Sequence, residues 1–241
     1  MTEKSFADSF DANYAEICEK IKTSAKKSGR TADDIILLAA TKTVSAENIN
    51  YAIGKGISYI GENRVQELLS KDALVERDAH RHFIGHLQTN KVKDIVPRVE
   101  MIQSVDSVRL ANIIGREAVK CGKVMDILLE VNIGGEESKS GFTPSDVYEA
   151  VDEISKIDGV CVKGIMSIPP VCTDREIQRG YFNKLHDIFV DISHKKLDNS
   201  NRLYLSMGMS SDYDLAIECG ANLVRIGTAL FGARNYIQKE N

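Results

Sequence analysis

The strongest constraint on the fold is the regular alternation of short apolar runs with amphipathic segments. The runs are rich in β-branched and large aliphatic residues, a pattern typical of strands buried on both faces in a parallel sheet. We place eight of them, at residues 35–43, 57–60, 82–84, 101–105, 126–133, 160–166, 202–205 and 223–226. Eight βα units in 241 residues predict an α/β fold of the (β/α)8 TIM barrel type.

The segments between these runs favour helices. We expect helices at 45–55, 89–96, 107–120, 174–195 and 211–219, another with Thr143 as its N-cap, and a polar turn at 198–201. Before the first strand, apolar residues at helical spacing and a basic, glycine-terminated end predict an extra N-terminal helix at 5–28. We therefore expect one domain over 1–241, with the βα units at 35–232. A doubly wound open sheet is the alternative, but it would usually carry a G-x-G-x-x-G turn, which this sequence lacks.

Composition excludes several functional classes. The net charge of −4 argues against a nucleic-acid or anionic-membrane surface. The first residues are not a signal peptide, and no apolar run is long enough to span a membrane. Five cysteines without a C-x-x-C pair favour free thiols in a cytoplasmic protein. His80, His82 and His86 have no acidic or cysteine partner at ligand spacing, so we expect no metal site.

The first predicted strand has a lysine, Lys42, at its carboxyl end. In α/β folds this end of the strands forms the ligand site. Partial desolvation there favours the neutral amine, which can attack a carbonyl group and form a Schiff base. The alternative is a lysine whose alkyl chain packs on the strand end while its ammonium stays in water.

Glycines and hydroxyl groups are concentrated after the last two strands. Ser206 and Gly208 follow one strand, and Gly227 and Thr228 follow the other. Loops at these positions commonly bind phosphate in barrels, although the two glycines could simply permit tight turns. A lysine facing a phosphate site suggests a ligand with an aldehyde and a phosphate, namely pyridoxal 5′-phosphate (PLP). Schiff-base aldolases for sugar phosphates share the two elements.

Several segments also carry a family resemblance, and they occur in order over nearly the whole chain. They are 40–43, 61–67, 82–91, 138–142, 164–169, 205–210 and 224–234. Together they resemble the pyridoxal phosphate homeostasis protein family, which is related to the N-terminal barrel of alanine racemase. The resemblance implies a fold type III barrel that holds PLP as an internal aldimine on Lys42.

The resemblance also implies the remaining cofactor-binding residues. Phosphate contacts are expected from the segment containing Ser206, Gly208, Gly227 and Thr228, and contacts near the ring from Asn63, Met166 and Ser167. Arg225 is expected to lie against the pyridine nitrogen. One position departs from the family pattern: many members have proline where this chain has His86, and the role of His86 is left open.

An arginine beside the pyridine nitrogen affects activity. Arg225 would stay protonated and keep that nitrogen unprotonated, which weakens the electron sink of PLP. Racemases with this arrangement use a second base, a tyrosine from another domain of the partner subunit. After Gly232 the sequence leaves too few residues for such a domain, and we expect Tyr236 to pack the last turn. Without that dimer interface, we expect a monomer.

We therefore expect a protein with no catalytic residues that takes part in vitamin B6 homeostasis. It would bind PLP and deliver it to apo-enzymes without strong turnover. A racemase-like enzyme of fold type III is the alternative, and weak racemase activity is compatible with the first reading. Lys91, Lys93 and Lys139 could form a cationic entrance for the phosphate, or simply be solvated lysines.

Overall fold

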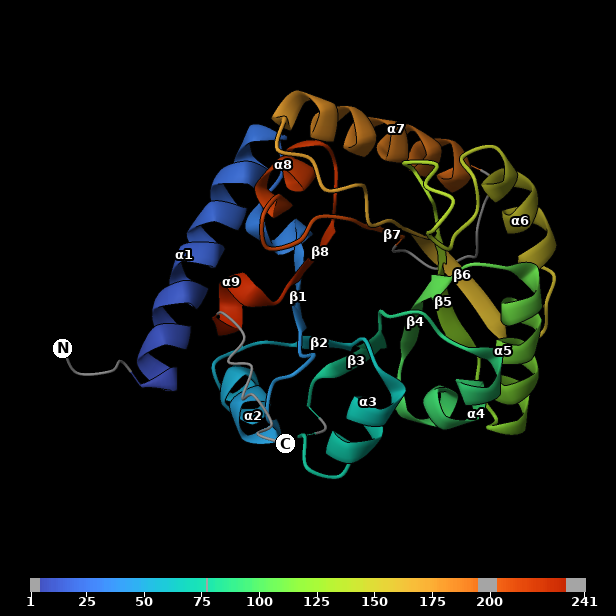
Figure 1. Ribbon diagram of the computed structural model, residues 1–241, viewed down its shortest axis with the longest axis horizontal. Helices are drawn as coiled ribbons and strands as arrows, with labels where there is room; N and C mark the ends of the chain where they lie inside the picture. The colour runs from blue at the N-terminus through green and yellow to red at the C-terminus, as the bar shows by residue number, and fades with distance from the viewer. Residues whose placement is uncertain (1–4, 77, 195–202, 233–241) are drawn as a thin grey trace.

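The computed structural model describes residues 5–76, 78–194 and 203–232. Eight strands form a closed barrel in which each strand lies between its two neighbours in sequence, and β8 pairs with β1 (Figure 1). All pairings are parallel. The strands are β1 Ile36–Ala40, β2 Tyr59–Glu62, β3 His80–Phe83, β4 Met101–Val105, β5 Met125–Glu130, β6 Val160–Met166, β7 Tyr204–Ser206 and β8 Leu223–Ile226. The predicted (β/α)8 barrel is confirmed.

Helices surround the barrel (Figure 1), and short polar side chains begin several of them. The hydroxyls of Ser45 and Ser107 accept the N–H of the residue three positions later, and Asp174 caps its helix in the same way. The α-helices are α1 Phe6–Lys27, α2 Ala46–Gly54, α3 Val65–Lys71, α4 Val92–Ile95, α5 Val108–Lys120, α6 Asp146–Ile154, α7 Arg175–Ser193, α8 Tyr213–Glu218 and α9 Thr228–Phe231. Short 3-10 helices are η1 Ala32–Asp34, η2 Thr89–Lys91 and η3 Val96–Arg98.

The extra N-terminal helix is present as α1, and Ser5 caps its first turn. It lies along the outside of the barrel beside α8 and α9 (Figure 1). The Phe10 ring is 5.8 Å from the ring of Phe231 and 5.7 Å from that of Tyr51. Asn13 Nδ2 donates a 3.1 Å hydrogen bond to the Leu230 carbonyl. The helix therefore covers the seam where the last βα unit meets the first.

Some boundaries differ from the sequence expectation. The second strand begins later, at Tyr59, and continues to Glu62, while β5 ends at Glu130, two residues before Asn132. Thr143 caps its helix as expected, since its Oγ1 accepts the Asp146 N–H at 3.1 Å and its carbonyl accepts the Val147 N–H at 3.2 Å, and the regular helix α6 follows from Asp146.

The segment expected to be one helix at 89–96 is divided into η2, α4 and η3. Pro97 lies in η3, where its ring cannot donate the hydrogen bond that would continue the α-helix. The expected turn at 198–201 and Tyr236 lie outside the described residues.

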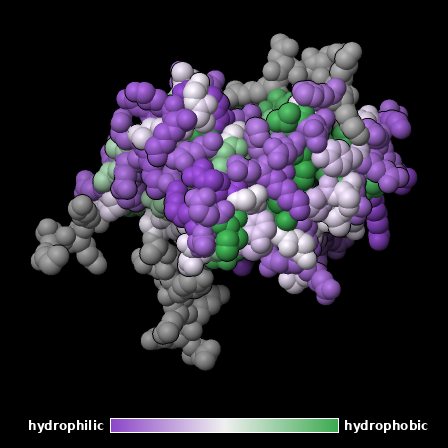
Figure 2. Space-filling model, turned by 90° about the horizontal axis from the view of Figure 1, so that it is seen from above, coloured by the Kyte–Doolittle hydropathy of each residue, from purple (hydrophilic) through white to green (hydrophobic). Residues whose placement is uncertain are grey.

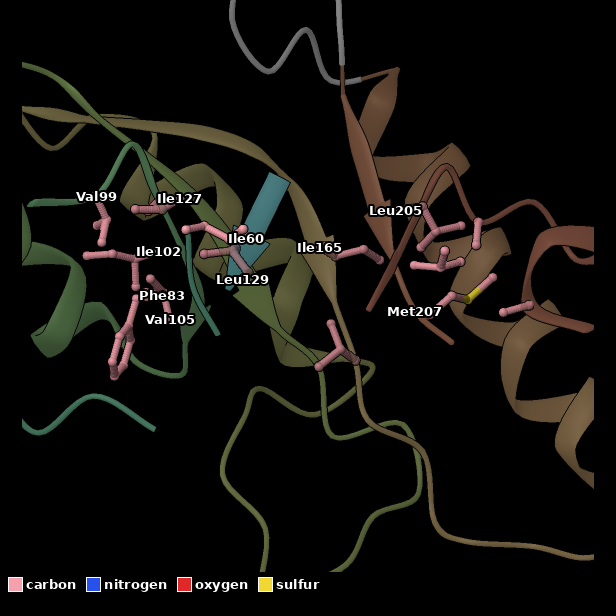
Figure 3. Packing of buried hydrophobic residues seen from close by; sticks show 14 of the residues in the cluster. Ile60, Phe83, Val99, Ile102, Val105, Ile127, Leu129, Ile165, Leu205 and Met207 are labelled. Atoms are coloured by element: carbon pink, nitrogen blue, oxygen red, sulfur yellow. The ribbon is translucent and has the colours of Figure 1, made fainter. Parts of the chain in front are cut away.

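Alternate residues of each strand face opposite sides of the barrel wall. Ile36, Leu38 and Ala40 lie in an inner cluster with Ile84 and Leu223, whereas Ala39 belongs to the outer cluster between the strands and the helices. Figure 3 shows part of that outer cluster, with Phe83, Ile102 and Val105 lying close together. The interior is thus filled with side chains, which leaves the strand ends as the place for a ligand.

The surface is dominated by polar residues. The face in Figure 2 is mostly hydrophilic, with separate small hydrophobic areas. Within the described ranges, no helix combines the length and the apolar character that crossing a bilayer requires.

Candidate functional site

A pocket of about 300 Å³ opens at the carboxyl ends of the strands, where the barrel fold places ligand sites. Its volume is in the range of small-molecule sites. Residues of β1 and β8, of the loops after β1, β2, β3, β6, β7 and β8, and of the start of α9 form its wall. They are Ala40, Lys42, Asn63, Ile84, Ile168, Met209, Ser210, Ser211, Arg225, Gly227 and Thr228.

Lys42 and Asn63 form part of the wall on the side of β1 and β2. Lys42 follows β1 by two residues and is half-buried. The Asn63 Oδ1 atom is buried without a hydrogen-bond donor among the described residues. Gly85 allows the next loop to approach, since a Cβ at this position would lie 2.0 Å from the Asn63 carbonyl oxygen. Asn63 therefore offers a buried acceptor to a ligand in the pocket.

Ser210, Ser211, Gly227 and Thr228 bring hydroxyl and backbone groups together on the wall after β7 and β8. Ser210 Oγ accepts the backbone N–H of Gly227 at 3.3 Å and of Ala229 at 3.2 Å. Within the described part of the chain its hydroxyl acts only as an acceptor, so its proton can be donated to a ligand. This combination of donors suits an anion such as a phosphate group.

Arg225 reaches the pocket from β8, and its guanidinium is held by two buried groups. It donates to Ser206 Oγ at 2.6 Å and to the Ser167 carbonyl at 2.9 Å. Burial lowers the pKa of Arg225 to about 10, and nearby Glu130 and Asp212 oppose that shift. The side chain therefore remains positively charged at neutral pH.

A chain of buried hydrogen bonds extends from Arg225 across the barrel interior. The Ser206 hydroxyl donates to Gln103 Oε1 at 2.7 Å, which turns the Gln103 amide nitrogen toward His82 Nδ1, 2.8 Å away. An amide nitrogen can only donate, so His82 Nδ1 is the acceptor and the ring is neutral with its proton on Nε2. Burial and the charge of His80 lower the pKa of His82 to about 3.

Of the nine cofactor-binding residues predicted from the sequence, the structure brings five to the pocket wall. They are Lys42, Asn63, Arg225, Gly227 and Thr228. Ser206 and Ser167 instead bind Arg225 from the barrel interior, and both are fully buried. Met166 packs in an inner apolar cluster with Met101 and Leu128. Gly208 forms the turn after β7, and its carbonyl accepts the Arg225 N–H at 3.0 Å.

Sequence reasoning missed other residues of the site. Ser210 and Ser211 lie two and three residues beyond Gly208, and their hydroxyl groups were a usable signal. Gln103 was also detectable, as a polar residue inside the apolar run of β4. Its pairing with His82 was not, because it depends on how β3 and β4 align.

Glu130, at the end of β5, is a further ionisable group near Arg225. Burial and the neighbouring Asp106 raise the pKa of Glu130 to about 7, while Arg225 and Lys139 oppose the shift. Its carboxyl group is therefore partly protonated at neutral pH. The charge near Arg225 thus changes with pH in the neutral range.

His86 and the three lysines considered as an entrance do not form part of the pocket wall. His86 is exposed, with Nδ1 3.4 Å from Asp106 Oδ2. Lys139 pairs with Glu136 and also contacts the Ile168 carbonyl at 3.5 Å, so part of its charge is already compensated. Among the residues that the structure describes, no three His, Cys, Asp or Glu side chains gather as metal ligands would.

Comparison with known protein sequences places this geometry in a family. Residues 10–235 match the alanine racemase N-terminal domain family. The pyridoxal phosphate homeostasis protein of Aquifex aeolicus is 43% identical over 223 residues, which cover 92% of this chain and 97% of the relative. The Escherichia coli K12 protein of the same name is 33% identical over 231 residues, which cover 94% of this chain and 97% of the relative.

Solved structures agree with the sequence relatives. PipY of Synechococcus elongatus with PLP bound has a TM-score of 0.77 and 30% identity, covering 90% of this chain and all of that one. An alanine racemase of Clostridium difficile shares the fold, with a TM-score of 0.71 and 16% identity over 95% of this chain and 58% of its own. The match over nearly the full length of the closer relatives shows that the chain belongs to the pyridoxal phosphate homeostasis protein family, within the alanine racemase N-terminal domain family.

Proposed function

We propose that the protein binds PLP in the pocket at the strand ends, attached to Lys42, and takes part in the homeostasis and delivery of this cofactor. The single observation that supports this most strongly is that one pocket brings together Lys42, Asn63 and Arg225 with the hydroxyl and backbone groups that follow β7 and β8. The names of the relatives and the PLP in the PipY structure support the same cofactor.

The residues of the pocket fit the chemistry of PLP. When bound, PLP supplies an aldehyde whose carbon forms a C=N bond with an amine while its oxygen leaves as water. Lys42 provides an amine at the pocket. Asn63 Oδ1, which has no donor among the residues that the structure describes, can accept a hydrogen bond from a hydroxyl group, and a buried polar atom of this kind costs free energy unless a ligand satisfies it.

We assign the phosphate to the wall formed by Ser210, Ser211, Gly227 and Thr228. Ser206 was the serine favoured by the sequence, but its hydroxyl already binds Gln103 and Arg225 below the pocket. In this proposal Ser206 orients Arg225, and Ser210 binds the phosphate. Arg225 would face the ring nitrogen from the pocket floor and keep it unprotonated, since the guanidinium stays charged.

Two features support a carrier over an enzyme with strong turnover. A charged Arg225 beside the ring nitrogen weakens the electron sink needed for carbanion chemistry. On the described part of the pocket wall, no tyrosine, histidine or carboxylate stands ready as a second base opposite Lys42. We further propose that the protein acts as a monomer in the cytoplasm and that its recipients are apo-enzymes that require PLP.

A spectroscopic titration separates the two functions. The parent protein should develop a visible absorbance band when PLP is added, and Lys42→Ala should not. When the PLP-loaded protein is incubated with L-alanine, the alanine should keep its L configuration. Rapid racemisation that disappears in Lys42→Ala would instead favour the racemase-like enzyme. The absence of a band in the parent protein would refute PLP attachment.

A further inference from the structure

The residue after Lys42 has an unusual backbone conformation. Thr43 has a φ of +63°, and no other non-glycine residue among those described has a positive φ. This region is unfavourable for a β-branched side chain. Strained residues of this kind persist only where surrounding contacts hold them, and they cluster at functional sites. The strain lies directly beside the lysine of the pocket.

Glu67 of α3 holds Thr43 in this conformation. Its Oε2 atom accepts the Thr43 backbone N–H at 2.7 Å. Lys71, one turn later on α3, lies 3.5 Å from the same carboxylate oxygen. The side chains of Glu67 and Lys71 are only 21% and 14% exposed, so their ion pair is partly shielded from solvent, whereas Thr43 itself is exposed.

The backbone before Lys42 is held by the same helix. Lys71 Nζ donates to the Thr41 carbonyl at 3.0 Å and pairs with Glu62 Oε1 at 2.9 Å. Thr41 Oγ1 donates to the same Glu62 oxygen at 2.8 Å. Both neighbours of Lys42 are therefore bound to charged side chains of β2 and α3.

We infer that Glu67 and Lys71 are positioning residues that hold the turn at 41–43 so that the amine of Lys42 faces the pocket. The inference rests on the proposed function, in which Lys42 becomes attached to PLP. The lysine side chain is long and flexible, so a fixed backbone limits the positions that its amine can reach. The loop that carries Asn63 leads directly into α3, so the same helix also links two parts of the pocket wall.

Variants of Glu67 test this role in the full-length chain. Glu67→Ala removes the acceptor for the Thr43 N–H, whereas Glu67→Gln keeps an acceptor oxygen. Arg64→Ala is the matched control, because Arg64 pairs with Glu67 at 3.6 Å on its exposed side and does not hold the turn. We expect Glu67→Ala to slow covalent attachment of PLP by about tenfold to a hundredfold. Glu67→Gln and Arg64→Ala should keep the parent rate.

A ligand without the aldehyde separates positioning from loss of the pocket. Pyridoxine 5′-phosphate carries an alcohol in place of the aldehyde and cannot become attached to a lysine. Its affinity should be the same in Glu67→Ala as in the parent protein. An unchanged rate of PLP attachment in Glu67→Ala would overturn the inference. So would an equal loss of affinity for pyridoxine 5′-phosphate, which would indicate a collapsed pocket.

A measurement without cofactor distinguishes failure of this inference from failure of the proposed function. Lysines of the cofactor-free protein are acetylated with a trace of acetic anhydride, and the modified peptides are quantified by mass spectrometry. Release of the turn in Glu67→Ala should increase the acetylation of Lys42 relative to the exposed Lys22. An unchanged ratio would overturn the inference. If the parent protein binds neither B6 ligand, the proposed function fails, and the labelling ratio still decides the role of Glu67.

Discussion

The buried neutral His82 makes a specific contribution to stability that depends on pH. Its pKa falls from the ordinary value of 6.5 to about 3 in the folded protein. The unfolded chain therefore binds the proton more readily, so acid favours unfolding. This contribution is fully present above pH 6.5, and stability is lost as pH falls from there toward 3. At about pH 5, which is roughly 1.5 units below the pKa of the unfolded chain, protonation of His82 in the unfolded chain lowers the free energy of unfolding by about 2 kcal/mol.

Glu130 acts in the opposite direction and must be separated from His82. Its raised pKa of about 7 means that the folded state binds this proton more readily, so its contribution grows as pH falls below 7. The useful quantity is therefore a difference between proteins. The free energy of unfolding is measured by urea titration at about pH 7.5 and pH 5 for the parent protein and for His82→Asn.

The variant removes the titrating ring but keeps an oxygen that can accept the Gln103 amide. We expect acidification to cost the parent protein about 2 kcal/mol more than it costs His82→Asn. His80→Asn is the matched control two residues earlier, where the side chain is 50% exposed and bonded to Glu100. His80→Asn should change the stability lost between about pH 7.5 and pH 5 much less than His82→Asn does. Equal pH dependence in the parent protein and in His82→Asn would refute the reasoning.

Three further predictions follow from the site and the packing. Ser210→Ala should weaken PLP binding by about 1 kcal/mol in a binding titration, since one donor to the phosphate is lost; unchanged affinity would contradict our phosphate assignment. Glu130→Gln should make the protein lose about 2 kcal/mol more stability between about pH 7.5 and pH 5 than the parent protein does, because the opposing titration disappears; an equal loss would contradict the raised pKa. Gly164→Ala should lower the free energy of unfolding, measured in urea, by more than about 3 kcal/mol, because the φ of Gly164 is +134° and a Cβ there would lie 2.1 Å from the Tyr204 carbonyl oxygen. Gly180→Ala, on the open face of α7, should raise the free energy of unfolding by about 0.5 to 1 kcal/mol. Similar effects at both positions would argue against the packing described for β6 and β7.

The barrel itself was predictable because its strands are buried on both faces. The run that became β1 has apolar residues at every position, with Leu38 and Ala40 inside the barrel and Ala39 outside. Such a run identifies a strand in a parallel sheet without any knowledge of its partners. The boundaries were less predictable: the cap at Thr143 was found, but the second strand runs from Tyr59 to Glu62 rather than from residue 57 to 60.

The site was predictable where a residue lies just beyond a strand. Lys42, Gly227 and Thr228 were placed correctly at the mouth of the barrel because the carboxyl ends of parallel strands meet there. Depth along the barrel axis was not predictable. Ser206 is the last residue of β7 and is aligned with Leu223 at the start of β8, so its side chain lies below the pocket.

The buried chain through His82, Gln103 and Ser206 could not be derived from sequence either. Gln103 binds Ser206, 103 residues away, and His82, 21 residues away. Neither separation along the sequence corresponds to a helical or strand repeat, because the contacts depend on the register of the closed barrel. Polar residues inside apolar runs were the available sign that such a network exists.

Reductive trapping tests the central claim most directly. The protein is incubated with PLP, reduced with borohydride and digested, and the modified peptides are identified by mass spectrometry. The account predicts that the visible band disappears on reduction and that the phosphopyridoxyl group is found on the peptide containing Lys42. A protein that gains no band with excess PLP, or that carries the group only on other lysines, would contradict the account.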